Sequence, residues 1–196
     1  MIYSNLILNK KKFDELLKFK NTNQLPNAFI FHGNEGIGKE GHAIEFFAAL
    51  NCKLKKNTAC GHCISCMKTK KLQHEDLNII FPLPKNKTIN KNDSPLKALN
   101  NSDIDNMNKM LHDKGLNPYS KIKFQSANTI LINSIREIKK NINLSVDNEK
   151  YKIYLILEAE KLCFPNTESA NSILKILEEP PANVLFILIT SDISLL

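Results

Sequence analysis

The eight residues Gly33 to Glu40, GNEGIGKE, decide the fold. They follow an apolar run at residues 27–32, which is typical of a short buried strand, and they precede an apolar helical pattern that extends to about Leu50. Their spacing matches the first seven positions of the phosphate-binding loop, G-x-x-x-x-G-K-[ST]. Because it lies between a strand and a helix, the match favours a phosphate-loop fold over an ordinary glycine-rich turn.

The eighth position of the loop departs from the pattern. In a working loop, glycines let backbone N–H groups approach phosphate, the lysine neutralises charge, and a Ser or Thr hydroxyl holds Mg²⁺. Here the hydroxyl position is occupied by Glu40, whose carboxylate is negative and can only accept hydrogen bonds. This residue should weaken the binding of Mg-nucleotide, and the sequence leaves open whether ATP or ADP binds. The residues that retain the pattern are Gly33, Gly36, Gly38 and Lys39.

A second part of a nucleotide site is expected at the end of a later strand. A phosphate-loop ATPase places an Asp there to hold Mg²⁺, and many members follow it with a Glu that orients the attacking water. After the apolar residues 153–156, the Asp position is occupied by Leu157, which cannot bind a metal. Glu158 follows and fits either the water-orienting role or a solvated strand end. Loss of both metal-handling positions predicts that the site does not hydrolyse nucleotide.

Four cysteines follow the loop helix at a spacing typical of a structural zinc site. Two overlapping C-x-x-C pairs and one more distant Cys supply four thiolates, which fill a closed tetrahedral site. His62 could replace one ligand, but four thiolates already suffice. Disulfides are the alternative and are disfavoured in a reducing cytosol. We therefore expect a zinc module at residues 52–71, with the ligands Cys52, Cys60, Cys63 and Cys66.

Composition describes an ordinary globular chain of 196 residues with 42% hydrophobic residues. No apolar run approaches the roughly 18 residues needed to span a bilayer, and the N-terminus does not resemble a secretory signal, so we expect a cytoplasmic protein. The net charge of +7 is concentrated in residues 52–71, with six Lys and no acid, and in residues 85–123, with eight Lys and four Asp. Such segments are solvated faces or contact nucleic acid phosphate.

Strands and helices alternate along the chain, which predicts an α/β fold with a parallel sheet flanked by helices. Residues 85–126 break this pattern, because they are rich in Lys and Asn and contain only a weak helix near residues 103–111. We expect a flexible insertion there. The predicted strands are residues 27–32, 76–81, 152–157 and 184–190, and the predicted helices are residues 11–19, 39–50, 130–142 and 168–178.

Several of these segments together resemble the N-terminal AAA+ ATPase-type domain of bacterial DNA polymerase III clamp-loader subunits. The resemblance rests on the phosphate loop, the four-Cys insert directly after its helix, IREI at residues 135–138, KIYLILEAEKL at residues 152–162 and SANSILKILEEPP at residues 169–181. It covers nearly the whole chain outside residues 85–126, and its most specific part is the LEEPP ending. It implies an AAA+ domain over residues 1–196 that continues beyond Leu196.

Within this family, the resemblance implies a supporting role. The ATP-hydrolysing gamma/tau subunits keep the Thr and the Asp, so Glu40 and Leu157 make the chain resemble the non-catalytic delta-prime subunits, which act as the stator of a five-membered ring. The implied partners are gamma/tau and delta, with the sliding clamp and primer-template DNA reached through the complex, and no membrane. Thr190 matches the family's polar sensor position. The arginine of the Ser-Arg-Cys motif is expected beyond Leu196 and is assigned to no residue here.

Two other functions remain open at this point. The chain could be a competent gamma/tau ATPase that uses Glu40 as an unusual metal ligand. It could instead be a zinc-dependent nucleic-acid-binding module in which the lysines of residues 53–71 contact phosphate.

Overall fold

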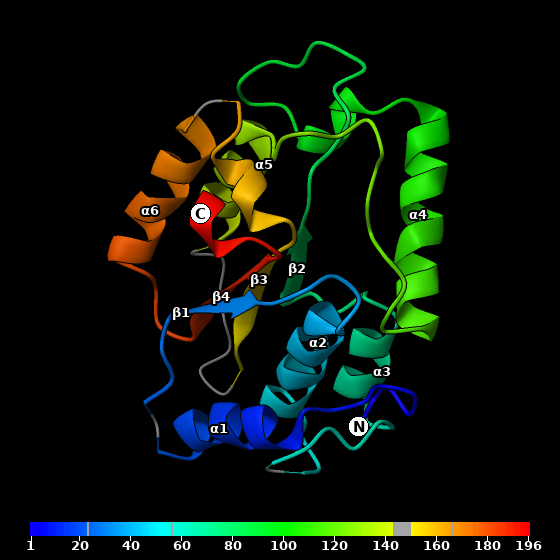
Figure 1. The fold of residues 1–196 in the computed structure, drawn as a ribbon, viewed down its shortest axis with the longest axis vertical. Coiled ribbons are helices and arrows are strands. Elements are labelled where there is room, and N and C mark those ends of the chain that lie inside the picture. The colour runs from blue at the N-terminus through cyan, green and yellow to red at the C-terminus, as the bar shows by residue number, and fades with distance from the viewer. Residues whose placement is uncertain (23, 56, 143–149, 166) are drawn as a thin grey trace.

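The computed structural model describes residues 1–22, 24–55, 57–142, 150–165 and 167–196. Its centre is a four-stranded parallel sheet with the order β1-β4-β3-β2 (Figure 1). The prediction of an α/β fold with a parallel sheet is thereby confirmed, while the AAA+ assignment stays a prediction. The strands are β1 (Ala28–His32), β2 (Leu77–Ile80), β3 (Lys152–Ile156) and β4 (Val184–Thr190).

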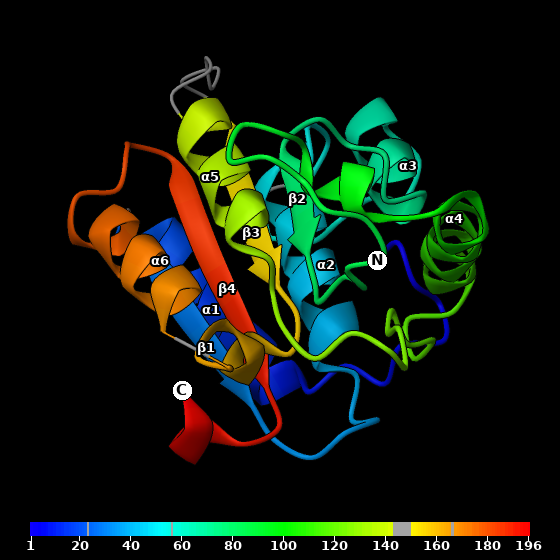
Figure 2. The same cartoon turned by 90° about the horizontal axis from the view of Figure 1, so that it is seen from above.

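Helices cover both faces of the sheet (Figure 2). Successive strand residues point to opposite faces, so Ile153 and Leu155 of β3 pack with α1 and α2, whereas Tyr154 and Ile156 pack with α5 and α6. Burial on both faces explains why β3 and β4 are continuous apolar runs. The helices are α1 (Lys10–Asn21), α2 (Lys39–Leu50), α3 (Ile64–Lys70), α4 (Asn101–Leu116), α5 (Ile132–Asn141) and α6 (Glu168–Glu178), and the short 3₁₀ turns are η1 (Pro95–Ala98), η2 (Ala159–Leu162) and η3 (Ile193–Leu195).

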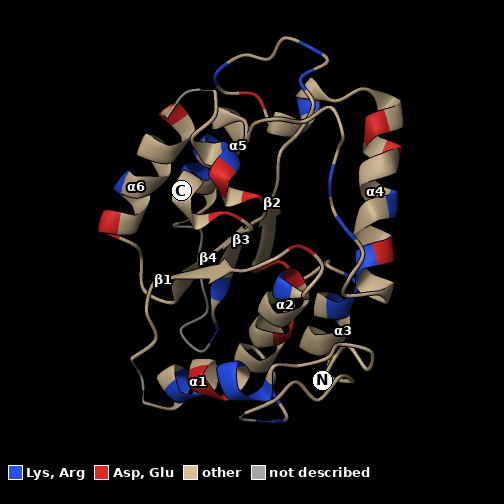
Figure 3. Cartoon of the chain, in the orientation of Figure 1, with Lys and Arg blue, Asp and Glu red and all other residues tan. Residues whose placement is uncertain are grey.

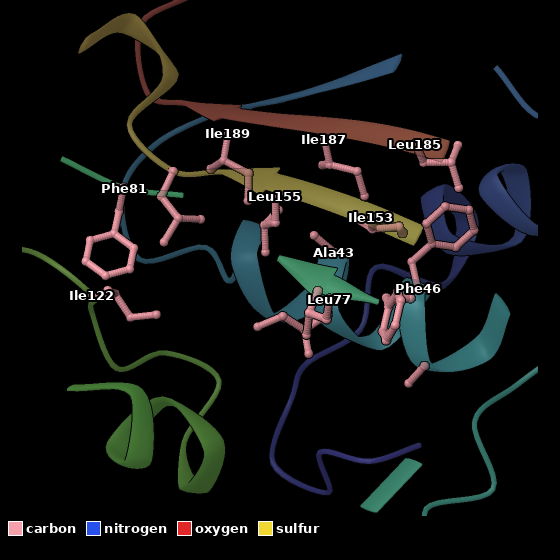
Figure 4. Close-up of a cluster of buried hydrophobic side chains, with 14 of the residues drawn as sticks. Ala43, Phe46, Leu77, Phe81, Ile122, Ile153, Leu155, Leu185, Ile187 and Ile189 are labelled. Atoms are coloured by element: carbon pink, nitrogen blue, oxygen red, sulfur yellow. The ribbon is translucent and has the colours of Figure 1, made fainter. Parts of the chain in front are cut away.

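The larger core cluster joins the phosphate-loop helix to the sheet (Figure 4). Ala43 and Phe46 of α2 lie against Ile153 of β3 and Leu185 of β4 in this cluster. This packing fixes α2 relative to the carboxyl ends of the strands, where the loop lies. The register of the sheet pairs His32 with Thr190, so the loop begins beside the end of β4.

Residues 85–126 contain more regular structure than the sequence predicts. The weak helix expected at residues 103–111 is the 16-residue helix α4, which begins after an Asn100 side chain that accepts a hydrogen bond from Asp103 N. Leu99, Ile122 and Phe124 from the same segment are buried in the core. The helix shows little apolar periodicity because its buried residues are only Met107, Lys114 and Gly115. Flexibility of this segment stays a prediction.

Two further differences concern short elements. The helix α3, inside the predicted zinc module, has no counterpart among the predicted helices, since seven residues are too few to show a period. The turn η2, which the sequence does not predict, begins three residues after the end of β3. Among the described residues, no helix is both long and apolar enough to cross a membrane.

Candidate nucleotide site and candidate metal centre

The loop between β1 and α2 has the backbone that its glycines permit. The φ angles of Gly33, Gly36 and Gly38 are +148°, +81° and +82°, a region that residues with a side chain rarely adopt. Gly38 is also the N-cap of α2, which begins at Lys39. The structure therefore places these four residues at the turn from strand to helix.

The lysine of the loop is engaged with the loop itself. Lys39 Nζ donates hydrogen bonds to the carbonyl oxygens of Gly33, at 2.5 Å, and Asn34, at 2.8 Å. Partial burial lowers the pKa of Lys39, and the nearby carboxylates of Glu40 and Glu35 oppose this shift. The ammonium thus lies over the turn, with two of its three donors satisfied by carbonyl groups.

The residue at the hydroxyl position of the loop has a charged partner that the sequence does not reveal. The Glu40 carboxylate contacts the ammonium of Lys114, near the end of α4. Lys114 is only 2% exposed, and its Nζ also donates to the carbonyl oxygens of Pro118 and Ser120, each at 2.8 Å. Burial lowers the pKa of Lys114, and Glu40 counteracts the shift. Three acceptors therefore surround a buried cation directly beside the loop.

Residues 117–124, which we call the strap, lie across the mouth of the loop. Lys121 Nζ pairs with Glu35 at 2.5 Å, and Lys123 Nζ pairs with Glu158 at 3.1 Å. The Tyr119 hydroxyl accepts a hydrogen bond from Ile7 N at 2.9 Å. The hydrogen bond to Glu158 raises the pKa of Lys123. Charged contacts thus join the strap to both the loop and the end of β3.

The space left between the loop and the strap is small. The pocket has a volume of about 80 Å³, whereas pockets that hold organic ligands usually measure about 300–1,000 Å³. Six of the seven predicted nucleotide-site residues line it, and Gly33 does not. The space beside the loop is therefore smaller than the pockets that usually hold organic ligands. The six lining residues are Gly36, Gly38, Lys39, Glu40, Glu158 and Thr190.

The residues at the carboxyl ends of the two central strands make contacts within the chain. Leu157 is 1% exposed and belongs to the core, as its apolar side chain requires. Glu158 pairs with Lys123 and with Lys161, the latter at 2.9 Å. The Thr190 hydroxyl donates to Asp192 O at 2.9 Å and accepts from Asp192 N at 3.0 Å. The sensor role of Thr190 stays a prediction, and its hydroxyl serves a local turn in this structure.

The four predicted zinc ligands come together. Their Sγ atoms all lie within 4.8 Å of one another, and those of Cys60 and Cys66 are 3.8 Å apart. A tetrahedral zinc ion with Zn–S bonds of about 2.3 Å requires sulfur separations of about 3.8 Å, so the group fits the metal. All five cysteines of the chain are free thiols, which fits zinc and not the disulfide alternative. The cluster consists of Cys52, Cys60, Cys63 and Cys66.

Backbone donors support a thiolate at Cys60, whereas burial raises the pKa of the Cys66 thiol. Cys60 N donates to Cys52 Sγ at 3.4 Å, and Cys63 N donates to Cys60 Sγ at 3.2 Å. Burial opposes ionisation of the Cys60 thiol, but hydrogen bonds from the backbone of His62 and Cys63 outweigh it and lower its pKa to about 6. Gly61, with a φ angle of +83°, lies in the turn between Cys60 and Cys63, which form the first C-x-x-C pair. The His62 ring bonds to Cys60 O instead of joining the sulfur cluster.

A family model described as "DNA polymerase III, delta subunit" matches residues 8–196. The chain belongs to this DNA polymerase III family. The resemblance drawn from the loop, the Cys cluster and the LEEPP ending is confirmed at that level. The family match does not distinguish a delta-prime subunit from its relatives.

Curated relatives of this DNA polymerase III chain carry related names. Subunit tau of Escherichia coli (strain K12) is 24% identical over 170 residues, which are 86% of this chain and 19% of that protein. Subunit gamma/tau of Mycoplasma genitalium is 29% identical over 173 residues, 88% of this chain and 21% of that protein. Subunit gamma of Buchnera aphidicola subsp. Schizaphis graminum is 39% identical over 72 residues, 37% of this chain and 19% of that protein. The chain spans about a fifth of the length of these relatives.

Sequence reasoning missed Lys114 and the strap as parts of the site in this DNA polymerase III family member. Lys114, Tyr119 and Lys123 lie in the segment that the sequence predicts to be a flexible insertion. Their partners are Glu40, Ile7 and Glu158, which lie far away in the chain. A Lys in an Asn-rich segment gives no local signal for such pairing, so only the folded structure reveals it.

Proposed function

We propose that the chain is a non-hydrolysing, delta-prime-type subunit of the DNA polymerase III clamp loader. In this role it supports the ring formed with gamma/tau and delta subunits, and it reaches the sliding clamp and primer-template DNA through that complex. The family match supports membership of DNA polymerase III. The subunit type, its partners and its lack of turnover are the proposed part.

The contact between Glu40 and Lys114 is the observation that carries this proposal. A carboxylate replaces the hydroxyl that would hold Mg²⁺, and a buried ammonium already neutralises that carboxylate. Leu157 removes the other metal-binding position, after β3. Phosphoryl transfer depends on metal charge near the phosphates, which this arrangement does not supply.

The proposal is tested first on the intact loader. A Lys39→Ala change in this subunit should leave ATP turnover by the loader within about twofold of the unchanged complex, because this loop takes no part in phosphoryl transfer. The matched control is the same change in the loop lysine of the gamma/tau subunit, which should abolish turnover. Turnover is measured as phosphate release with primer-template DNA and clamp present.

The competing gamma/tau ATPase assignment makes the opposite prediction. Under that assignment, Glu40 is a metal ligand and Lys39→Ala removes both nucleotide binding and turnover by this subunit. Mg²⁺-dependent release of phosphate from ATP by the purified full chain, lost on Lys39→Ala, would reject the non-hydrolysing assignment.

Direct contact with nucleic acid is a second candidate function, and its best support lies away from the Cys cluster. A cleft of about 540 Å³ between α5 and α6 is lined by five cations and a single carboxylate, Glu168. Figure 3 shows Lys and Arg positions on both helices. Arg136 pairs with Glu168 at 3.2 Å. Five cations and one carboxylate give the lining residues a net charge of +4. The cations are Lys91, Arg136, Lys139, Lys140 and Lys175.

Salt dependence distinguishes the two basic surfaces. If the cleft contacts phosphates, changing Lys139 and Lys140 to Ala should reduce the slope of log Kobs against log[salt] by about 2, because each neutralised phosphate contributes about 0.9. The probe is a 30-base-pair primer-template duplex. The matched control changes Lys53 and Lys55, which are exposed next to the Cys cluster. A slope that falls only in this control would assign binding to the Cys module.

A further inference from the structure

A slot of about 380 Å³ lies between the edge of the sheet and helix α4. Strand β2 forms one wall, Met107 and Leu111 of α4 line the other side, and α5 contributes Ser134 and Glu137. Figure 1 shows α4 standing apart from β2 on this side of the molecule. The volume falls in the range that protein ligands fill, and the slot is separate from the phosphate loop.

The wall formed by β2 is an open sheet edge. This strand is last in the order of the described sheet, and its neighbour β3 lies on one side only. Ile153 N donates to the carbonyl oxygen of Asp76, and Leu157 N donates to that of Ile80. The backbone groups of the even-numbered residues 76, 78 and 80 therefore face β3. By the alternation of a strand, the N–H and C=O of Ile79 face away from β3, and no hydrogen bond joins them to another described residue. An edge of this kind can pair with another chain.

A buried hydroxyl in the slot lacks its partner. Tyr154 is 2% exposed and lines the slot, and its hydroxyl has no hydrogen-bond partner among the described residues. Its ring is held by stacking on Phe186, with centroids 5.3 Å apart. Burial raises the pKa of Tyr154 to about 12, so the hydroxyl keeps its proton and can donate it. Leaving such a group unpaired is unfavourable, and an acceptor on a ligand would recover this loss.

The lining of the slot divides by chemistry. Most of the lining residues are apolar, and among them Leu77, Met107 and Leu111 belong to the larger core cluster or pack against it. The polar lining residues include one charged group, the Glu137 carboxylate, which accepts a hydrogen bond from the Ser94 hydroxyl at 3.5 Å. No Lys or Arg lines the slot, although the chain carries a net charge of +7. Charge complementarity therefore favours a basic ligand group here.

We propose that this slot binds an extended peptide segment of a partner protein, which adds as a strand to β2. The segment exchanges backbone hydrogen bonds with Ile79 and packs an apolar side chain against Met107 and Leu111. One of its carbonyl or hydroxyl oxygens accepts a hydrogen bond from Tyr154, and a basic side chain lies beside Glu137. Strand addition uses backbone pairing for affinity and side-chain pockets for specificity, which is the division of roles that this lining offers. The inference does not depend on the function proposed above.

The test uses the purified full chain, labelled with ¹⁵N, and a defined peptide, acetyl-Thr-Val-Lys-Val-Thr-amide. The peptide should shift the amide resonance of Ile79 and slow its hydrogen exchange, since that N–H gains an acceptor. A peptide of the same sequence with N-methylated valines cannot pair along the edge and should not bind. The Tyr154→Phe variant keeps the ring and should bind the first peptide about 3- to 10-fold more weakly.

A charge exchange makes the test specific. In Glu137→Lys, the preference should reverse, so that a peptide with Glu in place of its Lys binds better than the original. Equal binding of the N-methylated peptide, an unshifted Ile79 amide at millimolar peptide, or an unchanged preference in Glu137→Lys would each overturn the proposal. Protection of Ile79 that grows with protein concentration, without peptide, would assign the slot to a second copy of the chain and would also overturn it.

Discussion

At the scale of single residues, Glu40 and Lys114 join the phosphate loop to α4 through a buried contact. Lys114→Met should lower the free energy of unfolding by about 2 kcal/mol, because it leaves the carboxylate without its counter-ion and two carbonyls without a donor. The double variant Glu40→Thr with Lys114→Met should recover at least about 1 kcal/mol of this loss. Urea unfolding followed by circular dichroism measures both values.

The control for this pair is Lys121→Met. Lys121 also pairs with a glutamate of the loop, Glu35, but its side chain is 59% exposed. Solvent screens such a pair, so the change should cost less than about 0.5 kcal/mol. If the Glu40 and Lys114 changes proved additive, the two side chains would not be coupled and the buried contact would be rejected.

At the scale of elements, the packing of α4 on α3 depends on a missing side chain. A Cβ atom at Gly115 would lie 2.7 Å from the carbonyl oxygen of Lys70, a backbone atom that cannot rotate away. Replacing Gly by Ala inside a helix usually stabilises it by about 1 kcal/mol. Gly115→Ala should instead lower the free energy of unfolding by about 1–2 kcal/mol, because α4 must move away from α3.

The matched control is Asn108→Ala on the exposed face of the same helix. There the change should raise the free energy of unfolding by a few tenths of a kcal/mol, as helix propensity predicts. Thermal and urea unfolding of both variants give the comparison. A stabilising Gly115→Ala would show that α4 does not lie against α3 in solution.

At the scale of the whole molecule, we expect a zinc ion bound by the Cys cluster to stabilise the segment between α2 and β2, in addition to the core contacts of Ala59 and Cys66. Purified chain should contain one zinc ion, measured by elemental analysis, and removal by a chelator should lower Tm by at least about 4 °C, since 1 kcal/mol corresponds to about 2–4 °C at this size. Cys66→Ser should lose the metal because each ligand completes the tetrahedron.

Cys163→Ser is the control for the metal, since Cys163 lies outside the cluster. It should keep one zinc ion per chain and an unchanged response to the chelator. A chain that contained no zinc when purified without chelators would reject the four-thiolate site, whatever its sulfur geometry.

The sequence predicts the parts of this fold that local patterns determine. The loop with its flanking strand and helix follows from fixed spacing, and β3 and β4 follow from apolar runs buried on both faces. The meeting of the four cysteines follows from their spacing. Lys114 could not be predicted, because its role comes from a partner distant in the chain and its helix buries few apolar residues. The Tyr154 hydroxyl, which has no hydrogen-bond partner among the described residues, has no sequence signal either, since a Tyr in an apolar strand is usually an ordinary core residue.

Helix α4 carries groups from two separate sites within two turns. Met107 and Leu111 line the slot beside β2, and Lys114, three residues further, contacts Glu40. A rigid helix cannot shift at one of these positions without shifting at the other, so anything that displaces α4 at the slot changes the free energy of the loop contact. Thermodynamic linkage makes this relation reciprocal. Binding of a segment at the sheet edge would therefore change the equilibrium of the phosphate loop, and a change in the loop would alter the affinity of the sheet edge to the same extent.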